Sequence, residues 1–256
     1  SIKSLNVFHA NVNSIVAGSK MDELSSLAVK FKLDIIAITE TWLGSTVDSE
    51  AISLDGFQTP VRRDRNRHGG GVLIFVSDHI AFRRRCDLES LTDECIWLEL
   101  FPGTFRVLFS AYYRPPGQNL ETVDSFIDSF QNSVFTAASL NVDTIIITGD
   151  FNAKHGAWWH LDPNSSAGSK LFQSSQMLNL TQMITEPTCD LSRSPSLIDL
   201  LFTDASSRVQ STSVLSPLSG CHHCPIIANF DFVIKPPPPY VRTVWDFSKI
   251  DYASLV

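Results

Sequence analysis

Side chains suited to acid–base and metal chemistry stand where apolar segments of this sequence end. Asn11 and Asn13 follow the first apolar segment, and Glu40 follows IIAIT. Asp150 and Asn152 follow TIIIT in the same way. A carboxylate beside an apolar strand is costly to bury without a partner, and a sheet holds the ends of its strands rigidly. The pattern therefore favours a site built from strand ends, with unrelated turn residues and caps as the alternative.

Further candidates occur near the end of the chain. Asp199 interrupts the apolar run SLIDLLF, and His222 and His223 precede PIIANF. Taken alone, His223 is typical of a satisfied core histidine. Its interest comes from the whole set of strand-end residues.

The charge distribution is uneven. The chain has 20 Lys and Arg against 27 Asp and Glu, a net charge of −7, which argues against a general nucleic-acid coat. Between Pro60 and Arg85, however, seven Arg stand against two Asp, a local charge of +5. Such a distribution suits an anionic ligand held at one place, with carboxylates reserved for a metal. The alternative is a solvated Arg-rich loop that holds nothing.

Composition excludes several protein classes. The length and a hydrophobic content of 43% suit one large domain with one core. No apolar run approaches the length of a membrane span, which is about 20 residues, and we expect no membrane partner. Five cysteines at irregular spacing predict reduced thiols, and Cys221-His222-His223-Cys224 is only half of a zinc site. The N-terminus shows no signal-peptide pattern, so we expect an excised, intracellular domain.

The strand-end residues need a framework of alternating strands and helices. Strand patterns cover 4–9, 34–40, 72–76, 96–100, 105–113, 144–148, 196–203, 209–215 and 225–232. One helical pattern begins at a capping box, Ser19-Lys-Met-Asp22, and continues through Leu24, Leu27, Ala28 and Phe31. Two further helical patterns cover 123–134 and, more weakly, 168–178. Some strands adjoin in hairpins and others are separated by helices. This predicts two packed sheets of about eight strands in all, with helices outside.

Six short motifs follow one another along the chain: Asn11-Val-Asn13, Thr39-Glu40-Thr41, Tyr113-Arg-Pro115, Gly149-Asp150-Phe151-Asn152-Ala153, Ser196-Leu-Ile-Asp199 and His222-His223-Cys224-Pro225. In this order they resemble the endonuclease/exonuclease/phosphatase superfamily, and they span nearly the whole domain. Within it, the Arg-rich stretch with Gly69-Gly70-Gly71 and the segment GDFNAKHGAWW resemble the apurinic-endonuclease-like endonuclease domain of non-LTR (LINE-type, Jockey-like) retrotransposons.

The resemblance implies an α/β fold, a four-layer α/β sandwich of two packed, mostly antiparallel β-sheets flanked by helices. The endonuclease domain would cover 1–234. Residues 235–256, which begin with KPPPPY, would form a proline-rich linker and tail leading towards a reverse transcriptase. Such an enzyme nicks chromosomal DNA in the nucleus and leaves a 3′-OH that primes reverse transcription. The expected partners are double-stranded DNA and the reverse transcriptase domain of the same polyprotein.

The resemblance also assigns roles around the scissile phosphate. Glu40 would hold Mg²⁺, with Mn²⁺ as an alternative, and Asp150 would activate or orient the attacking water. Asn152 would steady the water or the phosphate. Asn11 and Tyr113 would hydrogen-bond the phosphate and its leaving side.

The remaining assigned roles concern a histidine and the DNA. His223 would donate to a non-bridging oxygen, while Asp199 fixes its tautomer and raises its pKa. Asn13 and His222 are expected to be auxiliary. Residues expected to contact DNA are Arg62, Arg63, Arg65, Arg114, Arg193 and Ser196. By resemblance the loop 187–195 would probe the DNA groove, with an ordinary surface hairpin as the alternative.

One position departs from the family. His222 stands where relatives carry an aspartate of the metal neighbourhood, which places metal affinity in question. His222 and the basic patch therefore leave a catalytically weakened DNA-binding module as an alternative. A second alternative is an abasic-site repair endonuclease, which has the same set of active-site residues.

Overall fold

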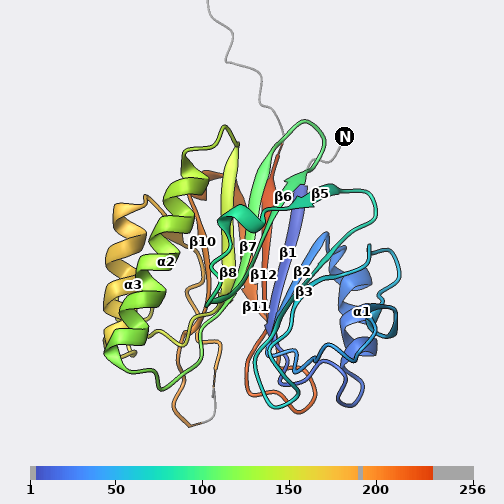
Figure 1. Cartoon of the computed structure of the whole chain (residues 1–256), viewed down its shortest axis with the longest axis horizontal. Helices are drawn as coiled ribbons and strands as arrows, with labels where there is room; N and C mark the ends of the chain where they lie inside the picture. Colours follow the sequence, from blue (N-terminus) through green and yellow to red (C-terminus); the bar gives the residue numbers. More distant parts are fainter. Residues whose placement is uncertain (1–3, 190–192, 233–256) are drawn as a thin grey trace, which may run out of the picture.

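The computed structural model describes residues 4–189 and 193–232, and the twelve strands in these ranges form two six-stranded sheets (Figure 1). The first sheet has the order β11 (Val209–Val214), β12 (Ile226–Asp231), β1 (Ser4–Asn11), β2 (Ile35–Thr39), β4 (Val72–Val76) and β3 (Val61–Arg63). The second has the order β5 (Ala81–Arg84), β6 (Glu94–Phe101), β7 (Val107–Tyr113), β8 (Thr144–Asp150), β10 (Asp199–Thr203) and β9 (Thr181–Gln182). Among the neighbouring strands of these two sheets, only the pairs β1–β2 and β7–β8 are parallel.

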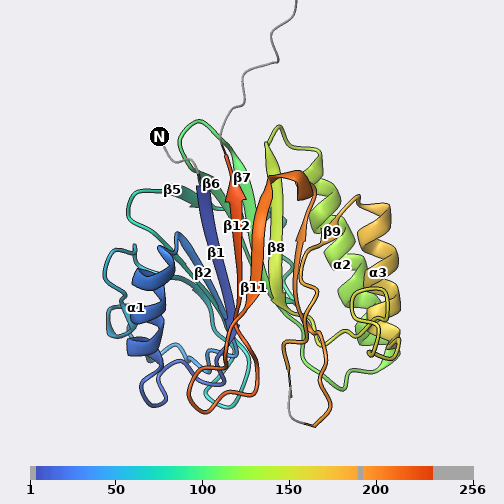
Figure 2. The same cartoon turned by 180° about the vertical axis from the view of Figure 1, so that it is seen from behind.

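Helices cover the outer faces of both sheets. Helix α1 (Lys20–Phe31) lies outside the first sheet, whereas α2 (Leu120–Ala138) and α3 (Ser166–Met177) lie side by side outside the second (Figures 1 and 2). Short 3₁₀ turns occur at η1 (Ser49–Ile52), η2 (Cys86–Leu88) and η3 (Ser206–Arg208). The predicted four-layer α/β sandwich is confirmed. In the described ranges, no helix combines the length and apolar character needed to cross a bilayer.

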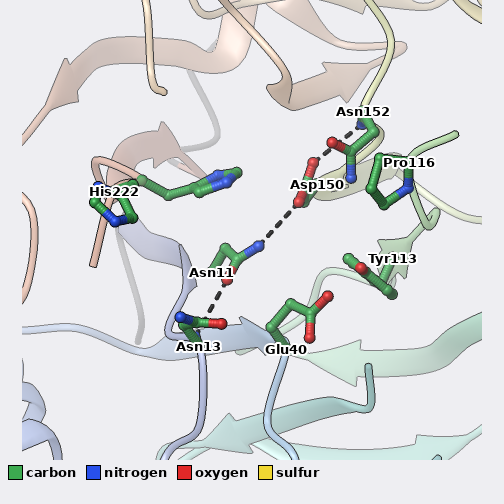
Figure 3. Close-up of a pocket in the computed structure, with 9 residues that line it drawn as sticks. Asn11, Asn13, Glu40, Tyr113, Pro116, Asp150, Asn152 and His222 are labelled. Carbon is green, nitrogen blue, oxygen red and sulfur yellow. Dashed lines mark hydrogen bonds between the residues drawn. The ribbon is translucent and has the colours of Figure 1, made fainter. Parts of the chain in front are cut away.

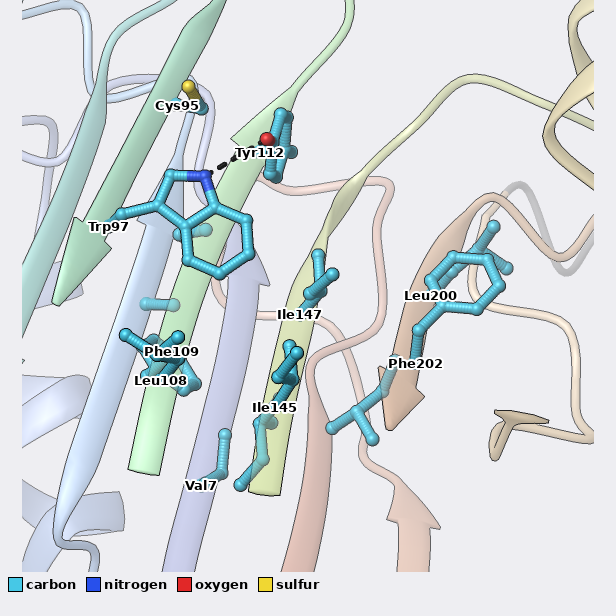
Figure 4. Packing of buried hydrophobic residues seen from close by; sticks show 14 of the residues in the cluster. Val7, Cys95, Trp97, Leu108, Phe109, Tyr112, Ile145, Ile147, Leu200 and Phe202 are labelled. Atoms are coloured by element: carbon cyan, nitrogen blue, oxygen red, sulfur yellow. Dashed lines mark hydrogen bonds between the residues drawn. The ribbon is translucent and has the colours of Figure 1, made fainter. Parts of the chain in front are cut away.

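Alternation along β1 divides the core into two clusters. Leu5 and Val7 face the second sheet and belong to the main core, whereas Phe8 and Ala10 face α1. The main core continues through the second sheet to α2, and Trp97 Nε1 donates to the Tyr112 hydroxyl within it at 3.0 Å (Figure 4). Because side chains two residues apart share a face, the inner face of β1 ends in polar residues 9 and 11.

Side chains cap two of the three helices, α2 and α3. The Asn119 carboxamide accepts from Thr122 N, and the Ser165 hydroxyl accepts from Gly168 N, so both side chains cap their helices. The capping box predicted at Ser19 is wrong. The Ser19 hydroxyl donates to Glu23 Oε1 at 2.7 Å and caps no backbone N–H.

Three strands lack a counterpart in the sequence prediction: β3, β5 and β9. All three are edge strands with half-buried or exposed residues. An edge strand is covered on fewer sides, so it does not need the continuous apolar run that marks a central strand. The predicted linker and tail, 235–256, lie outside the described residues.

Candidate active site

The ends of β1, β2, β7 and β8 surround a pocket of about 210 Å³ (Figure 3). Its lining residues are Asn11, Asn13, Glu40, Tyr113, Pro116, Asp150, Asn152, His222 and His223. Eight of these nine are residues that the sequence singled out. Asp199 is fully buried and does not line the pocket, and its carboxylate accepts a hydrogen bond from His223. Strand ends from both sheets thus bring residues more than 200 positions apart to one place.

The backbone is strained at four residues in or beside the pocket. Asn13, Glu40, Trp42 and Asn152 have φ of 48°, 54°, 54° and 44°. Asparagine tolerates this left-handed region, but glutamate and tryptophan seldom adopt it. Such conformations persist where surrounding structure over-determines them, and they cluster at functional sites.

Gly149 allows β8 to lie close to β7. A Cβ at this position would lie 1.9 Å from the carbonyl oxygen of Tyr112. The glycine is therefore required by the close approach of the two parallel strands, one residue before Asp150.

Asp150 is 1% exposed and is held on both carboxylate oxygens. Asn11 Nδ2 donates to Oδ2 at 2.9 Å, and the backbone N–H of Asn152 donates to Oδ1 at 3.0 Å (Figure 3). Burial, with the charge of neighbouring Asp199, raises the pKa of Asp150 to about 7. A carboxyl group with this pKa exchanges its proton near neutral pH, as a general base must.

Asp199 is paired with His223. His223 Nδ1 lies 2.8 Å from Asp199 Oδ2, and the Thr188 hydroxyl donates to the same oxygen at 2.7 Å. Burial acts to raise the pKa of Asp199, but the His223 charge and hydrogen bonds outweigh it and hold the pKa below the usual range. Burial likewise acts to lower the pKa of His223, but the Asp199 carboxylate raises it to about 12. The pocket therefore presents an imidazolium beside the Asp150 carboxyl group.

Glu40 lies across the pocket and is fixed by two donors. Trp42 Nε1 and the backbone N–H of Gly70 both donate to Oε2, at 2.5 and 2.7 Å. Burial, together with Glu40, raises the pKa of the Tyr113 phenol well above its ordinary value, so the phenol stays protonated and can donate. A fixed carboxylate on an open pocket wall suits a hard cation such as Mg²⁺, which takes one or two carboxylates and keeps several waters.

A second group of potential metal ligands comprises Asp150, Asp199 and His223, whose ligand atoms lie within 4.8 Å of one another. His223 would have to lose its proton to coordinate a metal. With its pKa at about 12, this imidazole acts as a cation. Metal binding at this cluster would therefore compete with the proton on His223.

The arginines have partners within the protein. Arg114 is 4% exposed and donates to the carbonyls of Phe151 and Asn152, both at 2.6 Å, so it holds the loop after β8. Arg62 pairs with Asp64 and with two carbonyls. Arg63 donates to the carbonyls of Ser90 and Leu91.

Arg65 lies beside Tyr113, one of the residues that line the pocket. Its guanidinium pairs with Glu94 at 2.8 Å and lies 5.7 Å from the Tyr113 ring centre. Arg193 is exposed, whereas Ser196 is 3% exposed and pairs through its backbone with Cys189. Part of the loop 187–195, namely 190–192, lies outside the described residues.

Four residues that bond the site residues were not predicted from the sequence: His9, Thr188, Trp42 and Glu94. His9 Nε2 lies 3.2 Å from Asp199 Oδ1, and Glu94 accepts from Gly71 N and Arg65. The only signal for His9 was a polar residue inside an apolar strand, two positions before Asn11. Trp42 carried no signal in the pattern, because its role depends on the turn after β2.

Part of the chain matches a known protein family. The family described as "Endonuclease-reverse transcriptase" matches residues 107–227. A sequence comparison with curated proteins found no match.

Several solved structures share the fold. The endonuclease domain of TRAS1, a telomere-specific non-LTR retrotransposon, matches with a TM-score of 0.71 at 18% identity, covering 89% of this chain and 98% of that one. An AP endonuclease from Leishmania major matches with a TM-score of 0.72 at 15% identity, covering 90% and 89%. A 3′ phosphatase from Neisseria matches with a TM-score of 0.68 at 17% identity, covering 89% and 100%.

At these identities the structural matches establish the fold, while the family match concerns the sequence itself, from β7 through the Asp150 and Asp199 motifs to β12. Residues 107–227 are thus similar in sequence to the family described as "Endonuclease-reverse transcriptase", and the chain shares its fold with the endonuclease domain of TRAS1 and with an AP endonuclease.

Proposed function

We propose that the protein is a divalent-metal-dependent endonuclease that nicks double-stranded DNA and leaves a 3′-OH end. One observation carries the proposal: a buried carboxyl group with a pKa of about 7 and a half-buried imidazolium face one pocket, opposite a fixed glutamate. Phosphodiester hydrolysis needs a base for the attacking water and positive groups beside the phosphate. This pocket offers both.

Each residue has a role that its surroundings support. Asp150 orients the attacking water and takes its proton, since Asn11 and the Asn152 N–H fix both of its oxygens. His223 donates to a non-bridging phosphate oxygen while Asp199 holds its Nδ1–H. The protonated Tyr113 phenol donates on the leaving side.

Glu40 is the residue that would hold Mg²⁺, or Mn²⁺ in its place. Trp42 and Gly70 fix its carboxylate before any ion binds, which reduces the ordering that binding requires. The ion, when bound, would neutralise charge on the phosphate and on the leaving oxygen.

The retrotransposon setting is part of the proposal. The family description and the likeness to the TRAS1 endonuclease support a chromosomal target and a nick that primes reverse transcription. A reverse transcriptase domain of the same polyprotein would follow the proline-rich segment, and the site of action would be the nucleus. The loop 187–195, with Arg193, and the guanidinium of Arg65 would contact the DNA.

Nicking of supercoiled plasmid tests the activity. We expect relaxed circles with Mg²⁺, none with EDTA, and at least a hundredfold loss of rate in Asp150→Asn, the scale of losing a general base. Extension of the nicks by a DNA polymerase would show the 3′-OH. Abasic and intact duplexes compared side by side separate target nicking from abasic-site repair. Binding of DNA without any nicking would instead indicate a silent module.

A further inference from the structure

The inner face of β1 carries two polar side chains, His9 and Asn11, and both cross to the second sheet. Asn11 Nδ2 bonds Asp150 on β8, and His9 Nε2 bonds Asp199 on β10. The two aspartates are themselves register partners in the antiparallel pair of β8 and β10. One strand of the first sheet thus holds the carboxyl groups of Asp150 and Asp199 on the second sheet, from positions 9 and 11 on one face.

The carboxylate of Asp199 has separate partners on its two oxygens. Thr188 and His223 bond Oδ2, whereas His9 bonds Oδ1. Both His9 and Asp199 have side chains that are 0% exposed, so water does not replace a lost donor there. A buried carboxylate oxygen left without a donor is costly, and the group would turn or take up a proton to relieve it.

The hydrogen of this bond resides on His9. The His223 charge and its hydrogen bonds hold the pKa of Asp199 below its usual range against burial, so the carboxylate only accepts. His9 must therefore carry its hydrogen on Nε2. Its Nδ1 has no partner among the described residues, which fits this tautomer, because a bare lone pair is less costly to bury than an unpaired N–H.

We propose that His9 is a positioning residue that fixes the Asp199 carboxylate and, through it, the imidazole of His223. Its part in DNA cleavage rests on the proposed nuclease function. Asn11 fixes Asp150 in the same manner, so β1 sets the distance between the base and the imidazolium from a single rigid strand. His9 touches no part of the pocket itself.

The tautomer is a first test and needs no variant. Long-range ¹H–¹⁵N correlation spectra of the metal-free wild-type protein should show His9 with its hydrogen on Nε2. A hydrogen on Nδ1 would leave Nε2 unable to donate and would overturn the proposal. This measurement is independent of any nuclease activity.

Two near-isosteric variants supply the second test. His9→Gln retains an N–H donor at a similar distance from the backbone, whereas His9→Met fills the space without one. We expect His9→Met to shift the Hδ1 resonance of His223 and to lower kcat for nicking about tenfold with KM for DNA unchanged, whereas His9→Gln stays within about threefold of wild type. Ser110→Ala, which removes another buried hydrogen bond of the second sheet, is the matched control for lost stability.

The outcomes separate the two proposals. If His9→Gln and His9→Met have the same His223 Hδ1 resonance and the same kcat, then the hydrogen bond from His9 has no positioning role and His9 only fills space. A wild-type protein that does not nick DNA would refute the proposed function, while the His223 resonance would still decide the role of His9. Should His9→Met fail to fold, the wild-type tautomer and the His223 resonance in His9→Gln remain decisive.

Discussion

Two Asp–His pairs lie at opposite ends of β1 and differ in nearly every physical respect. Asp199 and His223 meet at 2.8 Å beside the pocket, where β1 ends at Asn11. Asp34 and His79 meet at 3.1 Å near the start of the strand, where Asp34 also accepts from Asn6 N.

The pKa shifts of the two aspartates have opposite signs. Burial raises the pKa of Asp34, and its bonds from Asn6 and His79 do not reverse this. Burial acts in the same direction on Asp199, but His223 and His9 outweigh it and lower the pKa. The partner explains the difference: the His79 side chain is 54% exposed, whereas that of His223 is 17% exposed. Water screens the first histidine, so residue types alone do not make a functional pair.

The largest expected effect is on activity and compares the same substitution at both pairs. His223→Ala should reduce the nicking rate at least a hundredfold, because it removes the cation that faces the phosphate. His79→Ala should stay within about twofold, because this residue lies at the other end of the strands. Initial rates on supercoiled plasmid at saturating Mg²⁺ measure both. Equal losses in the two variants would show that the comparison has no functional meaning.

Stability against pH should separate the aspartates by sign. The pKa of Asp199 is lower in the folded than in the unfolded protein, so the ionised carboxylate stabilises the fold at a pH above the unfolded-state pKa of about 3.9. This stabilisation is lost as the pH falls below that pKa towards the folded-state pKa. Asp199→Asn should cost about 3–5 kcal/mol at pH 5, the scale of breaking a buried ion pair, and less at pH 3. The native pKa of Asp34 is raised, so its contribution is present at pH 3 and is lost as the pH rises.

Urea unfolding of the metal-free protein at pH 3, 4 and 5 measures these differences. The difference in the free energy of unfolding between wild type and Asp199→Asn should increase as the pH rises. Over the same range, the free energy of unfolding of wild type relative to Asp34→Asn should fall. Parallel pH profiles for the two variants would contradict the assigned shifts.

The same physics explains what could be predicted from sequence. The runs IIAIT and TIIIT are central, covered strands, and burial forces their residues to be continuously apolar. The polar residues that follow them are conspicuous for that reason, which is why Glu40 and Asp150 could be found. The edge strands β3, β5 and β9 are not covered in this way, and they were not predicted.

Partners from distant segments could not be predicted. His9 bonds a residue 190 positions away, and no local pattern encodes that distance. Arg114 and Arg63 carry the charge expected of DNA-binding residues, yet the carbonyls they bond are visible only once loops have packed. Charge counted along the sequence says how many cations are present and not which of them are already engaged.

A smaller effect is expected at Glu40. Trp42→Phe removes the indole N–H that bonds Oε2 but keeps an aromatic ring. We expect the Mg²⁺ concentration for half-maximal nicking to rise about fivefold, with the rate at saturating Mg²⁺ near wild type, since one donor to a charged group is lost. Trp97→Phe, which removes the indole bond to Tyr112 in the core, is the matched control and should leave the Mg²⁺ curve in place. A shift in the control alone would assign the effect to packing.

The smallest expected effect contrasts neighbours in sequence, the exposed His222 with the half-buried His223. His222 lines the pocket, at the position where the sequence resemblance predicts an aspartate. His222→Asp adds a negative charge on the metal side, so it should lower the Mg²⁺ concentration for half-maximal nicking by about two- to threefold, a modest change because solvent screens an exposed charge. His222→Asn, similar in size and neutral, should leave that concentration unchanged. Superimposable Mg²⁺ titrations for all three proteins would mean that the charge of the side chain at position 222 does not affect binding of the ion.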